Sequence, residues 1–303
     1  MSRRLRRSIQ VAVTLACFVA LWRLADGEGA MRLLAASQAS WIIAALTALT
    51  LQTLLSALRW QLTASRLGVS LERGAAVREY YLSQIVNQTL PGGVLGDAGR
   101  AYRARSDAGF ALSGLAVVVE RLAGQVALFL VFAIGLLVAP WVPGGVEVPV
   151  WALLLLFAIP LCFAFALRSA ERVLPPFVRR LPEAFAHAVC AREVRFMQSV
   201  LSLGTALCNV AAFACCAVAV GFPLSLSAAL VLVPIVLFSM LVPLTVSGWG
   251  LREGAAAALL PLAGGTVAGA TAASVAFGLA VLIAALPGLL VLGFVATPDP
   301  VES

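Results

Sequence analysis

The sequence predicts an all-α protein, a polytopic membrane helical bundle that forms a single membrane domain over residues 1–303. Hydrophobic residues make up 62% of the chain and charged residues only 12%, whereas soluble domains carry about 25% charged residues. The mean hydropathy is +1.01. Many of the apolar residues form segments of about 20, the length with which an α-helix crosses a bilayer. No soluble core of this chain length could bury so much apolar surface.

Six segments are long and apolar enough to cross a membrane: 8–24, 38–58, 112–138, 150–168, 199–221 and 267–295. The first follows the basic run at residues 3–7 and is interpreted as an uncleaved signal-anchor, because no cleavage site of small residues closes it. In the last segment, Pro287-Gly288 predicts a kink. About six full spans are therefore expected.

The arginines orient these spans, and all 21 basic residues are arginine. Segments 59–79 and 169–198 are rich in arginine, whereas 25–37 holds one and 139–149 holds none. Because cytoplasmic loops carry an excess of positive charge, we expect the N-terminus and the C-terminus in the cytoplasm. The net charge of +7 is accordingly assigned to topology and lipid headgroups, and no nucleic-acid partner is expected.

Two further regions, 80–100 and 225–262, are apolar but interrupted by glycine and proline. Irregular backbone at membrane depth must be hydrogen-bonded by protein or by water in a cavity, and such interruptions often mark substrate sites. Two matching interruptions favour two broken, re-entrant helical hairpins. The alternatives are interhelical loops at the membrane surface and, in the second region, a full span over 225–243.

The order of elements predicts an inverted repeat, 8–138 and 150–295. Each half contains two spans, a broken helix and a long span. A shift of 154 residues places Gly96 on Gly250 and Leu90 on Leu244. Three crossings per half are an odd number, so the second half must be inverted. The first hairpin is then expected to enter from the cytoplasm and the second from outside.

Glu120 and Arg121 lie inside an apolar span, where an ionisable residue costs several kcal/mol unless it is paired or hydrated. Neighbouring helical residues point in different directions, so each needs a partner elsewhere. Alternatively, the pair lies at the interface and reaches the cytoplasmic surface. The candidate partners are Asp97 or Glu253 for Arg121, and Arg100 or Arg252 for Glu120.

The two interruptions also predict a binding site for an anionic headgroup. A half-helix that begins near Gly96 or Gly250 would offer free N–H groups and the positive end of its dipole. Buried arginines would add fixed donors. Helix pairing without a ligand is the alternative. The candidate substrate-binding residues are Asn87, Pro91, Gly92, Gly93, Gly96, Asp97, Arg100, Glu120, Arg121, Ser247, Gly248, Gly250, Arg252 and Glu253.

No metal, cofactor or catalytic residue is expected from the sequence. The one histidine, His187, has no plausible partners for a metal site. Five of the six cysteines lie in apolar runs, and none forms a Cys-x-x-Cys pair. No nucleotide-binding Gly-x-x-x-x-Gly-Lys-Ser/Thr motif is present, so transport would be passive, ion-coupled or driven by a partner.

Three ordered motifs carry a resemblance to a known family. They are Asn87-x-x-Leu90-Pro91-Gly92-Gly93-x-x-Gly96-Asp97-x-x-Arg100-Ala101, Val119-Glu120-Arg121-Leu122 and Pro243-x-x-x-Ser247-Gly248-Trp249-Gly250-Leu251-Arg252-Glu253. Together with Leu58-Arg59-Trp60, this set resembles the lysylphosphatidylglycerol synthase transmembrane-region family, the flippase-like domain proteins. The likeness covers residues from about 10 to 295.

The resemblance implies a bacterial inner-membrane protein whose partners are membrane lipids, either phospholipids or lipid-linked sugars. In the synthases a soluble C-terminal domain transfers the amino acid. Since this sequence ends soon after the last predicted span, that domain and its transferase activity are not expected.

Three functional hypotheses follow. The first is a flippase-like protein that handles an anionic or glycosylated lipid headgroup. The second is an intramembrane lipid-modifying enzyme that uses Asp97, Glu120 or Glu253 as acid or base. The third is a non-transporting scaffold for an envelope-synthesis partner protein, in which the buried charges can be replaced without loss of function.

Overall fold

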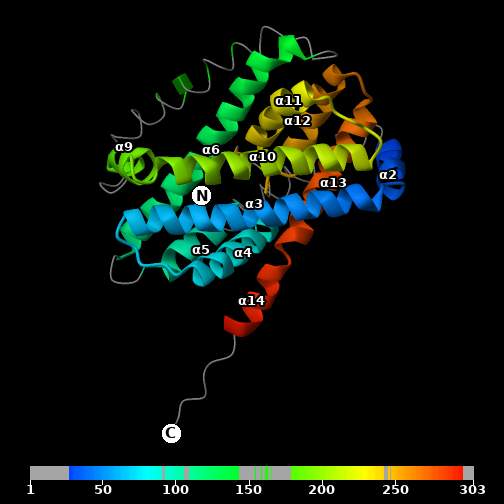
Figure 1. Cartoon of the computed structure of the whole chain (residues 1–303). Helices are drawn as coiled ribbons and strands as arrows, with labels where there is room; N and C mark the ends of the chain where they lie inside the picture. The colour runs from blue at the N-terminus through cyan, green and yellow to red at the C-terminus, as the bar shows by residue number, and fades with distance from the viewer. Residues whose placement is uncertain are drawn as a thin grey trace.

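The computed structural model describes residues 27–90, 93–105, 109–142, 179–241, 245 and 247–295, and five separate positions between 154 and 165. Within these ranges every regular element is a helix (Figure 1). The predicted all-α class is therefore confirmed. The predicted spans 8–24 and 150–168 lie outside the described residues, apart from the separate positions, so the expected number of six spans stays a prediction.

Four of the described helices are long and apolar enough to cross a membrane, namely 39–66, 109–141, 195–219 and 267–291. They coincide with four of the predicted spans. The principal helices are α2 (Gly27–Ala35), α3 (Ala39–Arg66), α4 (Arg73–Thr89), α5 (Leu95–Arg103), α6 (Gly109–Val138), α9 (Leu181–Phe185), α10 (Arg195–Ala219), α11 (Leu226–Phe238), α12 (Leu251–Leu259), α13 (Val267–Ala285) and α14 (Pro287–Val295).

Local sequence sets several helix boundaries. Ser225 and Thr266 accept hydrogen bonds from backbone N–H groups of the first turns of α11 and α13, as N-cap residues do. α13 ends at Ala285 and α14 begins at Pro287. Since proline has no N–H for the preceding turn, the helix is interrupted there, and the kink predicted at Pro287-Gly288 is confirmed.

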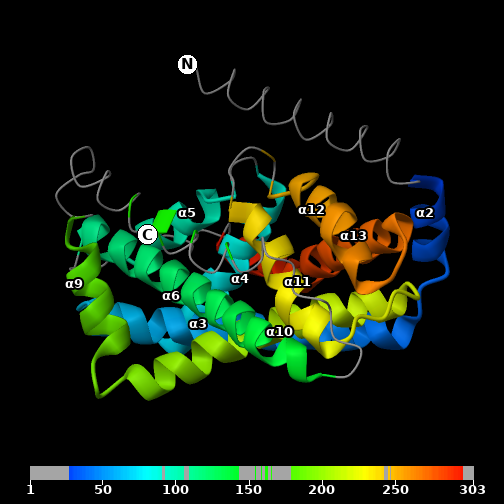
Figure 2. The same cartoon turned by 90° about the horizontal axis from the view of Figure 1, so that it is seen from above.

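Helices α3 and α10 lie side by side and antiparallel along one face of the bundle (Figures 1 and 2). At one end, the backbone N–H of Gln38 donates to the carbonyl of Ala219 over 2.9 Å. At the other end, Nε2 of Gln198 donates to Oγ1 of Thr63 over 3.0 Å. The main core around them is rich in buried alanine and valine, and small residues allow close helix packing in membranes.

Two helix pairs are broken where the sequence predicts interruptions. α4 ends at Thr89 before α5 begins at Leu95, and α11 ends at Phe238 before α12 begins at Leu251. The apolar helix 226–241 has fewer than 18 residues, which is shorter than the roughly 20 residues of a full span. The predicted interruption within 225–262 is therefore present, whereas re-entry of this hairpin into the membrane stays a prediction.

The two hairpins enter the bundle from opposite ends. α4 follows the end of α3, and α11 follows the end of α10, and those two ends are opposite because α3 and α10 are antiparallel. Figure 2 shows α5 and α12 on the same side of α3 and α10 but displaced toward different ends of the molecule.

The halves pack on each other reciprocally: α11 packs on α6, and α4 packs on α14. A glycine permits each contact. A Cβ added at Gly135 of α6 would lie 2.8 Å from the backbone of Leu230, and one at Gly288 of α14 would lie 2.4 Å from the carbonyl oxygen of Tyr81. The helix backbones approach too closely there for any side chain.

We therefore expect Gly135→Ala to destabilise the protein. The added methyl group must displace α11, and overpacking of this kind costs about 1–3 kcal/mol. Gly114→Ala, in the same helix but with nothing within 4 Å of the added Cβ, should be neutral or stabilising because alanine favours helix. Thermal unfolding of both variants in detergent, followed by size-exclusion chromatography, measures the difference. Equal unfolding midpoints would show that α6 and α11 do not pack this closely.

Candidate functional site

A cavity of about 730 Å³ lies between the tips of the two hairpins. Gly93 and Val94 line it from the first break, and Thr245, Ser247 and Gly248 line it from the second. Oγ of Ser247 donates to Oε1 of Gln88 over 2.8 Å. This hydrogen bond joins the second interruption to the last turn of α4, although the two residues are 159 positions apart in the sequence.

The cavity has an apolar wall and a polar wall. Ligand sites commonly combine a mainly apolar lining with a few fixed polar groups. The apolar wall comes chiefly from α3, α6 and the end of α11, and includes Leu49, Leu122, Val126, Phe129, Leu237 and Phe238. The polar wall comes from α3, α4, α5, α6 and α10, and it contains the charged residues Asp97 and Arg121.

Asp97 holds Arg121 at the edge of the cavity. Nη2 of Arg121 lies 2.8 Å from Oδ2 of Asp97. Oδ1 of Asp97 also accepts from Nε of Arg100 over 3.0 Å and from Oγ of Ser83 over 3.1 Å. The Arg121 side chain is 47% exposed, whereas that of Asp97 is 10% exposed. A fixed carboxylate thus orients a guanidinium that remains accessible.

Behind this pair lies Glu120, which is fully buried. Its two carboxylate oxygens accept from Nη2 of Arg59 over 2.6 Å and from Nη2 of Arg100 over 2.7 Å. Charge-assisted bonds of this kind are about twice as strong as neutral ones. The residues form one chain of ion pairs, Arg59–Glu120–Arg100–Asp97–Arg121, with three positive and two negative charges.

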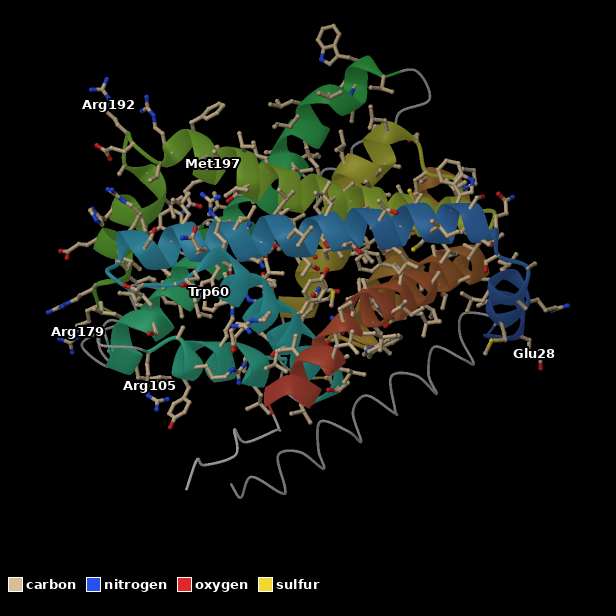
Figure 3. The ribbon with its side chains drawn as sticks, turned by 60° about the horizontal axis from the view of Figure 1, so that its bottom comes forward. Glu28, Trp60, Arg105, Arg179, Arg192 and Met197 are labelled. Carbon is tan, nitrogen blue, oxygen red and sulfur yellow. The ribbon has the colours of Figure 1, made fainter. Side chains whose placement is uncertain are left out.

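Aromatic rings enclose the central arginine of this chain. The guanidinium carbon of Arg100 lies 4.7 Å from the ring centroids of both Trp60 and Tyr80. Figure 3 shows Trp60 within the bundle, unlike Arg105, Arg179 and Arg192, which project from its surface. Cation–π contacts strengthen when they are desolvated, so the rings help to stabilise a cation with no access to water.

These contacts show which of the candidate partners of Glu120 and Arg121 pair with them. Of the candidate partners, Asp97 binds Arg121 and Arg100 binds Glu120. Glu120 does not reach the protein surface, because its side chain has no exposed surface. Arg59 was missed as a member of the cluster, although an arginine inside the apolar helix α3 is the same kind of signal as Glu120 in α6.

At the two half-helix starts where free N–H groups were predicted, the N–H groups of Gly96 and Gly250 are not free. The N–H of Gly96 donates to Oδ1 of Asn87 over 2.8 Å, and the N–H of Gly250 donates to Oε2 of Glu253 over 2.6 Å. Both half-helix starts are therefore capped by side chains of the protein. Gly250 has a φ of +88°, a conformation that favours glycine.

A second buried ion pair lies in the second hairpin. Nε of Arg252 lies 3.0 Å from Oε1 of Glu253 and 3.1 Å from Oγ of Ser274. The Arg252 guanidinium also contacts the rings of Trp249 and Phe277. Arg252 and Glu253 are thus each other's partners, and the alternatives that placed them against Glu120 or Arg121 are wrong.

The predicted site residues separate into three groups. Asn87, Gly93, Asp97, Arg121, Ser247 and Gly248 line the cavity. Gly96, Arg100, Glu120, Gly250, Arg252 and Glu253 lie outside its lining and cap or pair other groups. Pro91 and Gly92 lie outside the described residues. The sequence interpretation missed five cavity-lining amides, whose only signal was their place in otherwise apolar helices: Gln52, Gln84, Gln88, Gln125 and Asn209.

Within the part of the chain that the structure describes, no group of three or more histidine, cysteine, aspartate or glutamate side chains could hold a metal ion. The free cysteines found there are Cys162, Cys190, Cys208, Cys215 and Cys216. The polar chemistry of the cavity therefore comes from amides, hydroxyl groups and the Asp97–Arg121 pair.

Comparison with protein families supports the motif resemblance. The family model described as the lysylphosphatidylglycerol synthase TM region matches residues 8–288. No curated protein matches the chain. The matched region contains the cavity and both of the ion-pair clusters described above.

We expect Glu120→Gln to destabilise the protein strongly, because it removes the negative charge shared by two buried arginines. Breaking a buried pair in this way costs about 3–5 kcal/mol. Glu193→Gln is the matched control, since Glu193 is 68% exposed in its pair with Arg66 and exposed pairs contribute about 0–1 kcal/mol. The thermal midpoint in detergent should fall for the first variant only. Similar midpoints in both would contradict the assigned role of Glu120.

Proposed function

The chain belongs to the lysylphosphatidylglycerol synthase transmembrane-region family and is a multi-pass membrane protein; from this premise we propose that it moves a lipid with an anionic or glycosylated headgroup between the membrane leaflets. The observation that carries the proposal is the cavity between two hairpin tips that enter the bundle from opposite ends. Inside the membrane, the polar groups of such a cavity would lower the free-energy cost of moving a headgroup through hydrocarbon.

Arg121 is the proposed headgroup contact. Only Nη2 of its guanidinium is bonded to Asp97, and a guanidinium has five N–H donors. Its partial exposure at the cavity leaves donors for a phosphate oxygen, which arginine binds well. Arg100 and Arg252 are fully buried, so their proposed role is to hold the two hairpins in place.

We propose that the halves 8–138 and 150–295 form an inverted repeat. Moving α3 forward by 154 residues gives 193–220, close to α10 at Arg195–Ala219, and moving α5 gives 249–257, close to α12 at Leu251–Leu259. The antiparallel contact of α3 and α10 fits inversion, and so does the reciprocal packing of α11 on α6 and α4 on α14.

The buried arginines support the same repeat. A shift of 154 residues takes Gly124 to Gly278. A Cβ at Gly124 would lie 3.0 Å from Nη2 of Arg59, and one at Gly278 would lie 2.1 Å from Nη2 of Arg252. The same shift takes Glu120 to Ser274, which accepts from Arg252. Each half thus keeps a glycine and a hydrogen-bond acceptor at matching positions beside a buried arginine.

The proposed orientation places both termini in the cytoplasm of a bacterium, with the protein in its inner membrane. Arg105, Arg179 and Arg192 project near one end of the bundle, and Glu28 lies at the other end (Figure 3). Since positive residues favour the cytoplasmic side, the α4–α5 hairpin would enter from the cytoplasm and the α11–α12 hairpin from outside.

We propose that the chain itself catalyses no lipid modification. Asp97, Glu120 and Glu253, the acids considered for catalysis, each bind at least one arginine. Such partners stabilise the charged carboxylate, whereas a general acid must carry a proton. Lipid mass spectrometry of a deletion strain separates the hypotheses, because loss of a lipid species would indicate an enzyme and a changed leaflet distribution would indicate transport.

Arg121→Gln should reduce lipid transfer while leaving the fold intact. We expect at least a roughly tenfold slower rate, because hydrogen bonds to charged groups contribute about 1.5–3 kcal/mol. The measurement is leaflet exchange of fluorescent lipid in proteoliposomes that contain the purified full chain. Arg192→Gln, which removes an exposed surface arginine, is the control. Transfer that is unchanged by Arg121→Gln would contradict the role assigned to Arg121, and absence of transfer by the unaltered protein would favour a non-transporting scaffold.

The inverted arrangement predicts labelling from opposite sides of the membrane. In a background without the native cysteines, Arg73→Cys marks the exposed start of α4, and Leu226→Cys marks the exposed start of α11. A membrane-impermeant maleimide added outside spheroplasts should label the second position and should reach the first only after lysis. Labelling of both from the same side would contradict inversion.

A further inference from the structure

The cavity lining contains six carboxamide side chains: Gln52, Gln84, Asn87, Gln88, Gln125 and Asn209. An amide is uncharged and offers both donors and acceptors, so it matches hydroxyl groups, which also do both. The charged residues of the described lining are Asp97 and Arg121, which bind each other. The lining is therefore rich in hydrogen-bonding groups but carries no net formal charge.

Several of these polar groups have hydrogen-bonding capacity that the protein does not use. Oδ1 of Asn87 accepts from Gly96, but Nδ2 has no partner, although the residue is only 7% exposed. Oγ1 of Thr245 is also without a partner, and this residue is 2% exposed. Buried polar groups are normally satisfied, and leaving one unpaired costs about 1–3 kcal/mol. Both residues line the cavity, and since these two atoms themselves have almost no accessible surface, a ligand there would supply the missing partners after a small side-chain rotation.

We propose that the ligand is a lipid whose headgroup is an uncharged polyol or sugar attached through a single phosphodiester. This inference rests on the proposed function and names its substrate class. The amides and Thr245 bind the hydroxyl groups, and Arg121 binds the phosphodiester. The apolar wall around Leu122, Val126 and Phe129 holds the first part of the lipid chains.

The same lining should bind a headgroup that carries an ammonium group less tightly. A buried cation is stabilised most by a free carboxylate, but Asp97 is bound to both Arg121 and Arg100. Five of the six amides make at least one hydrogen bond within the protein, and a headgroup without hydroxyl groups would leave their remaining donors and acceptors unused. Sites built to bind hydroxyl groups reject such analogues.

Binding of matched lipids to the purified full chain, followed by native mass spectrometry, tests this assignment. Phosphatidylinositol and phosphatidylethanol with the same acyl chains carry the same single phosphodiester charge, but only the first has a polyol headgroup. Each hydrogen bond contributes a factor of roughly 3–10 in affinity, so we expect phosphatidylinositol to bind at least about tenfold more tightly. Phosphatidylethanolamine should bind more weakly than phosphatidylinositol.

The combined replacement Gln125→Leu and Asn209→Leu removes two cavity amides with little change in size. It should reduce the preference for phosphatidylinositol at least about threefold. Leu130→Met, an apolar replacement in α6 at an exposed residue outside the cavity lining, should leave the preference unchanged. Water-soluble glycerophosphoinositol should compete only weakly, because it lacks the chains that contact the apolar wall.

The outcomes separate this inference from the proposed function. Equal binding of phosphatidylinositol and phosphatidylethanol, or tighter binding of phosphatidylethanolamine, overturns the polyol assignment but leaves lipid transport standing. Competition by glycerophosphoinositol at the same concentration as the lipid overturns the assignment of a lipid. Absence of binding by all of these lipids overturns both proposals. The comparison of lipids on the unaltered protein is decisive even if a variant fails to fold.

Discussion

The carboxylate of Glu120 is the contact on which the arrangement of the first half depends. It lies in α6 and binds Arg59 of α3 and Arg100 of α5, so one buried anion ties a short half-helix to two long helices. Two buried cations would repel each other without it, and desolvation would add to that cost. Because Arg100 also binds Asp97, the position of Glu120 determines where Arg121 meets the cavity.

Each half stabilises a buried arginine with aromatic rings and a carboxylate, but the residues that do so differ. Each encloses a buried arginine between aromatic rings, Arg100 in the first half and Arg252 in the second. Each also places a buried arginine beside a glycine of a long helix, Arg59 beside Gly124 of α6 and Arg252 beside Gly278 of α13. In the first half the carboxylate comes from α6, at Glu120. In the second half Ser274 occupies the matching place, and Glu253, next to the arginine itself, supplies the charge. In the first half a further arginine, Arg121, faces the cavity. In the described part of the second half, no arginine lines the cavity.

The features predicted well from the sequence are those with a large energetic cost. A buried charge or a broken helix is costly anywhere in a bilayer, so Glu120, Arg121 and both glycine-rich breaks stand out without coordinates. The sequence does not say which of several partners lies within reach, and Arg252 accordingly proved to bind its neighbour. Nor does it distinguish an amide that faces a cavity from one that caps a backbone group, which is why Gln125 and Asn209 were missed.

The hydrogen bond between Ser247 and Gln88 holds the two hairpins together only weakly. A neutral hydrogen bond contributes only about 0.5–1.5 kcal/mol, and Ser247 has a φ of 50°, a left-handed conformation that is unfavourable for a residue other than glycine. Inside the first hairpin, by contrast, an ion pair between Arg103 and Glu79 joins α5 to α4. Under thermal agitation the bundle should therefore separate first along the line where the hairpins touch, with the first hairpin moving as one unit.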